Sequence, residues 1–337
     1  MCPLDSAQDP FPEMGSVRTY GIATRRSLVS VEDFCQVPEP IAGFAGFFDS
    51  LPDIYAGTHL KELVARIVAA KLAGRPIAVA LGAHVLKVGL APLLIDLMRR
   101  GVIDHIAMNG AGAIHDFEIA TAGCTSEDVG EQLPRGEFGF ADETGLGLAR
   151  AAERGSGLGA GKGREVGFGR ALGAMLIEEN APHCDVSVSA EAARLGIDCT
   201  VHVSLGADIV HMHPAADGAT IGASSLIDFR HVCRLVHGMN GGVWINVGCA
   251  VVLPETYLKA VSVALNLGAE LDDMTTANLD MLRQYRAETN VVQRPPGRGI
   301  SILGQHELLL PLLRQALLSK LAKAGWVSPR AQEGSQA

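Results

Sequence analysis

The chain has 337 residues, of which 48% are hydrophobic, 19% charged and 5% aromatic, and its formal net charge is −9. This length suits one large core or two smaller ones, and the acidity argues against nucleic acid as a partner. No apolar run reaches the roughly eighteen residues of a membrane span, and the start MCPLDSAQDPFPEMG lacks signal-peptide features, so we expect a cytoplasmic protein.

Short apolar runs that end at glycine turns alternate with segments of helical periodicity along most of the chain. The predicted strands are 76–81, 103–108, 197–203, 208–212, 243–247 and 271–276. The predicted helices are 88–100, 222–239, 254–267 and 304–324. This repeated alternation predicts an α/β fold with a doubly wound, mostly parallel sheet and helices on both faces. Such sheets bind ligands in the turns at the carboxyl ends of their strands.

The predicted organisation has three parts. Residues 1–40 are proline-rich and form an irregular N-terminal arm, 41–325 form a single α/β domain, and 326–337 form a flexible tail. A glycine-rich and acidic insertion at about 123–163 interrupts the domain. It is too long for a simple connection, so we expect a lid or an oligomer contact with a short helix near 144–154.

A cluster of reactive side chains lies in the segment MNGAGAIHDFE, residues 108–118, directly after a predicted strand. His115, Asp116 and Glu118 are expected in the first helical turn, where the helix dipole favours acids. Capping accounts for either acid alone but not for the imidazole beside them. An imidazole and carboxylates at a strand end suit general-base chemistry, with activity falling as the pH drops through about 6.5.

Small residues mark this turn and the other strand ends, as a bound dinucleotide requires. Gly-x-Gly at 110–112 would let a pyrophosphate approach the backbone, although a plain turn or a helix cap explains each turn equally well. The candidate cofactor contacts are Gly82, Ala83, His84, Asn109, Gly110, Gly112, Asp217, Gly218, Gly248, Thr275 and Thr276.

A metal site is the weaker interpretation of a further pair of histidines. His211 and His213 alternate on the predicted strand 208–212, and His202 lies nearby in the sequence. No acid stands at ligand spacing from them, so we expect hydrogen-bonding roles and no metal.

The order of these motifs resembles the deoxyhypusine synthase family and its wider superfamily of NAD-binding proteins, over roughly residues 44–324. The family pattern V-D-x-x-V-T-T-A-G-G-x-E-E-D is similar to residues 103–116. Asp104, Gly112 and Asp116 are in register with it.

Two more family segments have counterparts here. T-D-G-S-x-G is similar to residues 216–222, and G-G-G-V-V-K-H-H is similar to 248–255. The closing apolar helix of the family is similar to 308–318. The resemblance implies a Rossmann-like fold, NAD at the strand ends and a homotetramer.

The chain also departs from the family pattern. The family forms a covalent imine through a lysine in a W-G-K-x segment, and the comparable residues 290–297 contain neither tryptophan nor lysine. The Lys-His-His stretch is replaced by Leu253, Pro254 and Glu255, so deoxyhypusine synthesis is not expected. The His-Asp-x-Glu turn is closer to superfamily members that use NAD to convert ornithine to proline with release of ammonia.

The resemblance therefore implies an NAD-dependent transferase or lyase that acts on a small amine or amino acid through a transient imine. NAD would remove a hydride from the carbon that bears nitrogen, and NADH would later return it. His115 is the candidate base, while Asp116, Glu118 and Asp217 are candidates to hold an ammonium group or a ribose. The alternatives are a non-catalytic NAD-binding regulatory module and an ornithine-cyclodeaminase-like release of ammonia.

Overall fold

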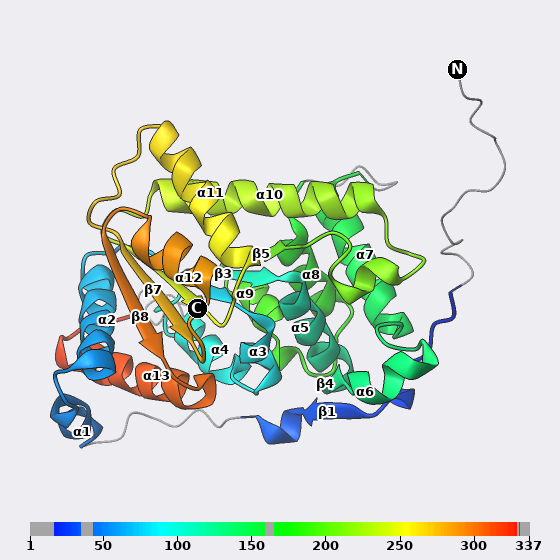
Figure 1. Ribbon diagram of the computed structural model, residues 1–337, viewed down its shortest axis with the longest axis horizontal. Helices are drawn as coiled ribbons and strands as arrows, with labels where there is room; N and C mark the ends of the chain where they lie inside the picture. Colours follow the sequence, from blue (N-terminus) through cyan, green and yellow to red (C-terminus); the bar gives the residue numbers. More distant parts are fainter. Residues whose placement is uncertain (1–16, 35–42, 159–164, 329, 331–337) are drawn as a thin grey trace.

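A six-stranded parallel sheet forms the centre of the computed structural model, which describes residues 17–34, 43–158, 165–328 and 330 (Figure 1). The strands are β2 (Ile77–Leu81), β3 (His105–Asn109), β5 (Asp198–His202), β6 (Val243–Val247), β7 (Thr275–Asp280) and β8 (Arg298–Leu303). Their order is β5-β3-β2-β6-β7-β8, and every neighbouring pair is parallel. The chain builds outward from β2 in both directions, which is the doubly wound Rossmann-like order, so the predicted fold class is confirmed.

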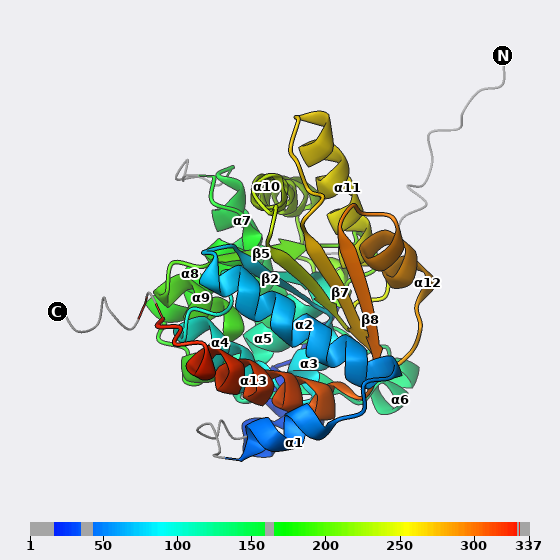
Figure 2. The same ribbon diagram turned by 90° about the vertical axis from the view of Figure 1, so that its left-hand side faces the viewer.

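Helices cover both faces of this sheet. One side carries α2 (Tyr55–Leu72), α3 (Ala83–Lys87), α4 (Ala91–Arg99), α5 (Gly110–Ala122), α9 (Val188–Arg194) and α13 (His306–Lys323). The other carries α10 (Gly218–His237) and α11 (Val252–Asn266), as Figure 2 shows. Near the β5 edge, α7 (Asp142–Ser156) packs against α8 (Phe168–Glu178) and α10. The short helices are α1 (Phe44–Ser50), α6 (Val129–Gln132), α12 (Tyr285–Ala287) and the π-helical turn η7 (Glu288–Gln293). None of the helices in the described ranges could span a bilayer.

The alternation of side chains along β2 separates two hydrophobic cores. Ile77, Val79 and Leu81 point to the α2–α5 side, whereas Ala78 and Ala80 point to the α10–α11 side. The small alanines leave room on that side for a large aromatic pair, whose rings stack at 4.5 Å. A continuously buried strand of this kind is what a parallel sheet covered on both faces requires.

The strand predicted at 208–212 is wrong. Ile209–Met212 forms a 3-10 turn, η6, in the connection between β5 and α10. The Ser204 amide donates to Asp208 Oδ2 at 3.0 Å, which bends the chain away from the sheet. Apolar residues alone indicated a strand here, but the carboxylate stabilises a turn instead.

The strand predicted at 271–276 is shifted toward the C-terminus. The Met274 amide donates to the Leu271 carbonyl at 3.1 Å in a turn, and sheet pairing starts with Thr275 opposite Val243. Thr275 and Thr276 consequently lie at the amino end of β7, on the edge of the sheet opposite the carboxyl ends of the strands. The predicted helix 88–100 also begins later, at Ala91.

The insertion forms a small layer beside the sheet. It contains β4 (Cys124–Glu127), α6, the 3-10 turn η4 (Leu133–Arg135) and α7, which confirms the short helix expected near 144–154. β1 (Ser27–Ser30) pairs with β4 in antiparallel register, between the 3-10 turns η2 (Ile22–Thr24) and η3 (Val31–Asp33). The described part of the predicted N-terminal arm is thereby attached to the insertion. Residues 1–16, 35–42 and most of the predicted tail lie outside the described residues.

Two glycine turns touch at the centre of the carboxyl edge. A Cβ on Gly82 would lie 2.0 Å from the Gly248 carbonyl oxygen, and the Gly82 amide donates to the Val247 carbonyl at 2.8 Å. Gly248 has a φ of +66°, and its own Cβ would meet the His306 ring at 2.6 Å. Packing between the loops therefore requires both glycines.

We predict that Gly82→Ala destabilises the protein by about 1–3 kcal/mol, because the added methyl group overpacks against the Gly248 backbone. The φ of Gly82 is −72°, so alanine brings no backbone strain. Gly222→Ala in α10, where no atom lies within 4 Å, is the matched control and should stabilise by roughly 0.5–1 kcal/mol. Urea unfolding measures both; equal effects would contradict the packing argument.

Candidate functional site

Helix α5 starts at the carboxyl end of β3 and carries the sequence cluster on two different faces. The Asn109 side chain accepts a hydrogen bond from the Gly112 amide at 2.9 Å and caps the helix. Since the helix starts at Gly110, His115 and Glu118 lie in its second and third turns rather than in the first. These two side chains share one face, and Asp116 lies on another, because successive residues are about 100° apart around a helix.

A small cavity lies against the His115 face of α5. Its volume is about 240 Å³, below the roughly 300–1,000 Å³ of drug-sized ligand sites, so it suits a small molecule. Ala111, Ile114, His115 and Glu118 line it from α5. The other lining residues are Arg25, Lys87, Ser126, Glu127, Val129, Phe138, Ala207, Asp208 and Ile209.

The Glu118 carboxylate is buried and fully engaged in polar contacts. Its Oε2 accepts from Arg25 at 2.7 Å and from the Thr125 hydroxyl at 2.5 Å, and its Oε1 accepts from the Thr144 hydroxyl at 2.9 Å. The Arg25 and Glu118 side chains are each only 2% exposed. Arg25 also lies 3.8 Å from Glu127. Glu118 is therefore an anchoring carboxylate that accepts three hydrogen bonds from other segments of the chain.

Thr125 connects this anchor to His115. The single hydroxyl proton of Thr125 is donated to Glu118, so its oxygen accepts from His115 Nδ1 at 2.7 Å. This arrangement assigns the ring proton to Nδ1 and leaves the lone pair on Nε2. No further hydrogen bond to the His115 ring occurs within the described part of the chain, so Nε2 is available to a ligand.

The electrostatic surroundings keep the His115 ring neutral. Burial lowers its pKa to about 4, with smaller contributions from Lys87 and Arg25, while Glu118 opposes the shift. An unprotonated base is therefore present throughout the neutral range. The value of 6.5 applies to a solvated imidazole, so burial moves the expected fall of activity from about pH 6.5 toward pH 4.

Opposite charges border the same cavity on its remaining sides. Lys87, at the end of α3, makes no ion pair or hydrogen bond through its ammonium group with any described residue. Asp208 packs against the start of α5, where a Cβ on Gly110 would lie 2.1 Å from its Oδ2. Burial raises the pKa of Asp208, and the Ser204 amide partly offsets that effect. The cavity thus presents a neutral base between a cation and a carboxyl group.

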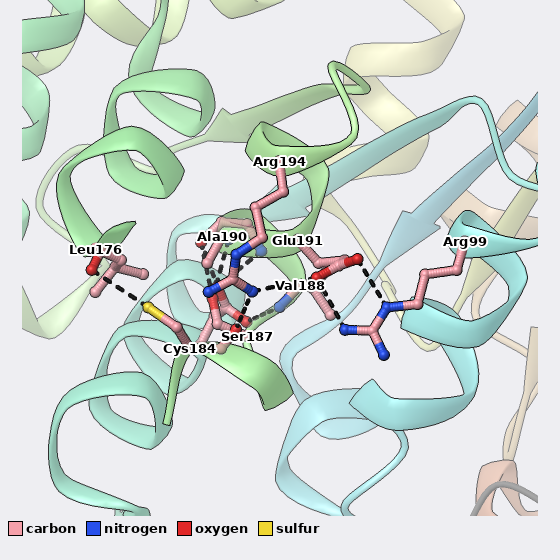
Figure 3. Close-up of polar contacts among 10 residues, drawn as sticks. Arg99, Leu176, Cys184, Ser187, Val188, Ala190, Glu191 and Arg194 are labelled. Carbon is pink, nitrogen blue, oxygen red and sulfur yellow. Dashed lines mark hydrogen bonds and ion pairs between the residues drawn. The ribbon is translucent and has the colours of Figure 1, made fainter. Parts of the chain in front are cut away.

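Asp116 lies outside this cavity and caps α9. It is 1% exposed and accepts from the Val188 amide at 2.7 Å, the Ser189 amide at 3.1 Å and the hydroxyls of Ser187 and Ser189. Figure 3 shows this end of α9, where Arg99 and Arg194 also bind the Glu191 carboxylate. The expected catalytic role of Asp116 is therefore corrected to a structural one, because the helix turns its side chain away from His115.

The other predicted cofactor contacts are spread over the carboxyl edge and beyond it. Gly82, Ala83, His84 and Gly248 gather at the switch point between β2 and β6, where the His84 and His306 rings lie 5.5 Å apart. The prediction that Thr275 and Thr276 contact a cofactor is corrected, since both lie at the amino ends of the strands, on the edge opposite these turns.

Asp217 and Gly218 are exposed at the start of α10. The Asp217 carboxylate accepts from the Ala219 and Thr220 amides, so it caps the helix, which is the alternative that the sequence left open.

The paired histidines make separate contacts. His213 lies 3.3 Å from Asp142, and the Gly206 amide donates to His211 Nδ1 at 3.2 Å. Across residues 17–34, 43–158 and 165–328, no group of three or more His, Cys, Asp and Glu side chains is arranged to hold a metal ion.

Four residues of the site were not predicted from the sequence: Arg25, Lys87 and Asp208, which line the cavity, and Thr125, which binds His115 beside it. None belongs to a recognisable motif. Arg25 meets α5 because β1, which follows it, pairs with β4, whereas Thr125 lies on β4 directly after α5. Arg26 follows Arg25 directly, so charge alone does not indicate which of the two binds a buried carboxylate.

The chain is similar to several solved structures. Unliganded AgrE matches with a TM-score of 0.50 at 16% identity, covering 77% of this chain and 32% of that one. The ternary complex of AgrE with ornithine and NAD+ matches with a TM-score of 0.49 at 14% identity, covering 80% and 34%. A candidate deoxyhypusine synthase from Entamoeba histolytica matches with a TM-score of 0.46 at 12% identity, covering 78% and 88%.

The chain therefore spans about a third of the length of AgrE. At these identities the likeness concerns the fold alone, and unliganded AgrE agrees with the Rossmann-like fold predicted from the sequence. No protein-family model and no curated protein matches the sequence.

We predict that Asp116→Ala destabilises the protein by about 3 kcal/mol, because several buried donors lose their acceptor. Asp217→Ala, which removes a helix cap at an exposed position, is the matched control and should have a much smaller effect. Denaturant unfolding followed by circular dichroism measures both. Equal midpoints for the two variants would reject the structural role assigned to Asp116.

Proposed function

We propose that the protein is an NAD-dependent enzyme that acts on a small amino acid or amine, with His115 as the base. The observation that supports this most strongly is the chain His115–Thr125–Glu118. It assigns the proton of a neutral imidazole to Nδ1 and leaves Nε2 free beside a cavity of small-molecule size. General-base catalysis needs an acceptor held in that state.

The charges around the cavity favour a zwitterionic substrate. Lys87 has no carboxylate partner among the described residues and can bind a substrate carboxylate. Asp208 lines the same cavity and can accept a hydrogen bond from an amino group. His115 is the neutral group of this cavity and would take a proton from the substrate nitrogen, which balances the loss of a hydride from the attached carbon.

The strand order of the sheet is the one that binds dinucleotides at its carboxyl edge in Rossmann folds. The order of the strands places the switch point between β2 and β6, where sheets of this kind bind dinucleotides. At this edge the His306 Nδ1 atom is buried without a hydrogen-bond partner in the described chain. Asn109, the N-cap of α5, lies at the carboxyl end of β3, the strand next to β2. The candidate contacts are Ala83, His84, Asn109 and Gly110. AgrE, which shares the fold, has been solved with NAD+.

Bound NAD would supply a hydride acceptor, and the residues of this chain would do the remaining work. Lys87 and Asp208 would orient the substrate, His115 would remove the proton, and Glu118 would hold Thr125 and thereby the imidazole tautomer. The deep position of Glu118 keeps water from competing for the Thr125 hydroxyl. The homotetramer remains a prediction that light scattering tests.

We predict that the protein binds NAD with micromolar or better affinity and turns over at least one small amino acid. Calorimetry measures binding, and release of ammonia or formation of NADH measures turnover. Lys87→Met should raise the KM for a carboxylate-bearing substrate more than it lowers kcat, because it removes binding rather than proton transfer. Binding of NAD without turnover of any amine would instead favour the non-catalytic module.

We predict that His115→Asn lowers kcat by roughly a hundred- to ten-thousand-fold while NAD affinity stays nearly unchanged. Thr125→Val should cause a smaller loss, because the proton is no longer assigned to Nδ1. The wild-type rate should stay level as the pH falls from 8 to 5 and drop only near pH 4, where the imidazole becomes protonated. His59→Asn, on α2, is the control. A fully active His115→Asn enzyme would remove the base assignment.

A further inference from the structure

A second, larger cavity lies on the α10–α11 side of the carboxyl edge. Its volume is about 460 Å³, within the roughly 300–1,000 Å³ typical of sites for drug-sized ligands. It is bordered by the end of β5, the middle of α10 and the first turns of α11. The lining residues are His202, Val203, Leu205, Gly222, Ser225, Leu226, Phe229, Glu255, Thr256 and Lys259.

One loop separates this cavity from the His115 cavity. Val203 and Leu205 line the larger cavity, and Ala207, Asp208 and Ile209 line the smaller one. The connection between β5 and α10 is thus a shared wall. The two cavities are adjacent along the edge of the sheet where ligands of such folds bind.

One wall of the larger cavity is apolar and exposed. Leu205 is 62% exposed and Leu226 is 51% exposed, although both carry large aliphatic side chains. Phe229 is partly buried one turn further along α10 and packs against the core of that face. Apolar side chains around a phenyl ring suit a flat aromatic ligand, and stacking on the ring adds stabilisation beyond the burial of area.

The opposite wall offers hydrogen-bonding groups. His202 Nε2 lies 3.1 Å from the Thr200 hydroxyl, which leaves Nδ1 for a ligand. Burial lowers the pKa of His202 to about 3, so the ring is neutral at physiological pH. The Thr256 hydroxyl donates to the Val252 carbonyl at 2.9 Å and keeps its lone pairs available.

The rim of the cavity favours an anionic substituent. The Glu255 carboxylate already binds Lys259 and Arg286 and accepts from Asn290 at 2.8 Å. It is therefore neutralised and offers little to a cation. Lys259 is more than half exposed, and an exposed ion pair of this kind is weak enough for the ammonium group to rotate toward a ligand.

We propose that this cavity binds a purine nucleotide. The base lies against Leu205, Leu226 and Phe229, the ribose hydroxyls bond to Thr256 and His202, and the phosphate approaches Lys259. The nucleotide can be a free mononucleotide or the adenosine half of a dinucleotide. The second source rests on the proposed function, because it requires that the protein binds NAD. The His115 cavity is too small to hold a whole dinucleotide, so the adenosine half would need a second cavity.

The test is calorimetric titration of the full-length protein with adenosine and AMP. Both should bind, and AMP should bind more tightly because of its phosphate. Leu226→Asp should abolish both, since it places a charge in the base site. Leu265→Asp is the matched control: Leu265 is similarly exposed, at 45%, but lies on α11 away from the cavity. Lys259→Ala should weaken AMP about fivefold and leave adenosine unchanged. Leu226→Ala serves if the aspartate variant unfolds.

NAD titration of the same variants identifies the source. Loss of NAD affinity in Leu226→Asp assigns the cavity to the adenosine half of NAD, and unchanged NAD affinity together with lost AMP binding assigns it to a free nucleotide. AMP that does not bind at millimolar concentration, or that binds equally to wild type and Leu226→Asp, overturns the proposal. Binding of AMP by a protein that does not bind NAD would instead contradict the proposed function and leave this inference intact.

Discussion

The buried ion pair between Arg25 and Glu118 holds the candidate site together. Both side chains are almost completely removed from water, and loss of either would leave an uncompensated charge in the interior, a change that typically costs about 3–5 kcal/mol. The pair joins the N-terminal segment to α5, and the hydroxyls of Thr125 and Thr144 bring in β4 and α7 at the same carboxylate. Four segments thus converge on one group, of which the one with Arg25 lies 93 residues earlier in the chain than Glu118. The orientation of His115 follows from these contacts.

Two faces of α5 have different surroundings. One face presents His115 and Glu118 to the cavity, and the other presents Asp116 to the start of α9. Substitutions at neighbouring positions should therefore have different consequences, a change of rate at His115 and a change of stability at Asp116. At the start of the same helix, packing requires glycine at position 110, because the Asp208 side chain occupies the space that a Cβ would need.

The carboxyl edge shows how packing and binding compete for the same residues. Gly82 and Gly248 are explained by contact between their loops, so glycine at a strand end is not by itself a sign of a phosphate group. Buried polar atoms without hydrogen-bond partners and exposed hydrophobic side chains are more specific indicators of a binding site. On that basis the connection between β5 and α10 is central, since it separates a small polar cavity from a larger one with an apolar wall.

Local patterns in the sequence were sufficient to predict the fold class, because apolar runs between glycine turns determine which segments are buried strands and which are amphipathic helices. They also led to His115, since its turn follows β3 directly. Local patterns failed where a distant contact decides the outcome. Asp208 makes a turn of a segment that looked like a strand, and sheet pairing places Thr275 at the wrong edge for a ligand. Only the tertiary structure brings Arg25 to Glu118, because its position depends on pairing between strands about a hundred residues apart, which no local periodicity encodes.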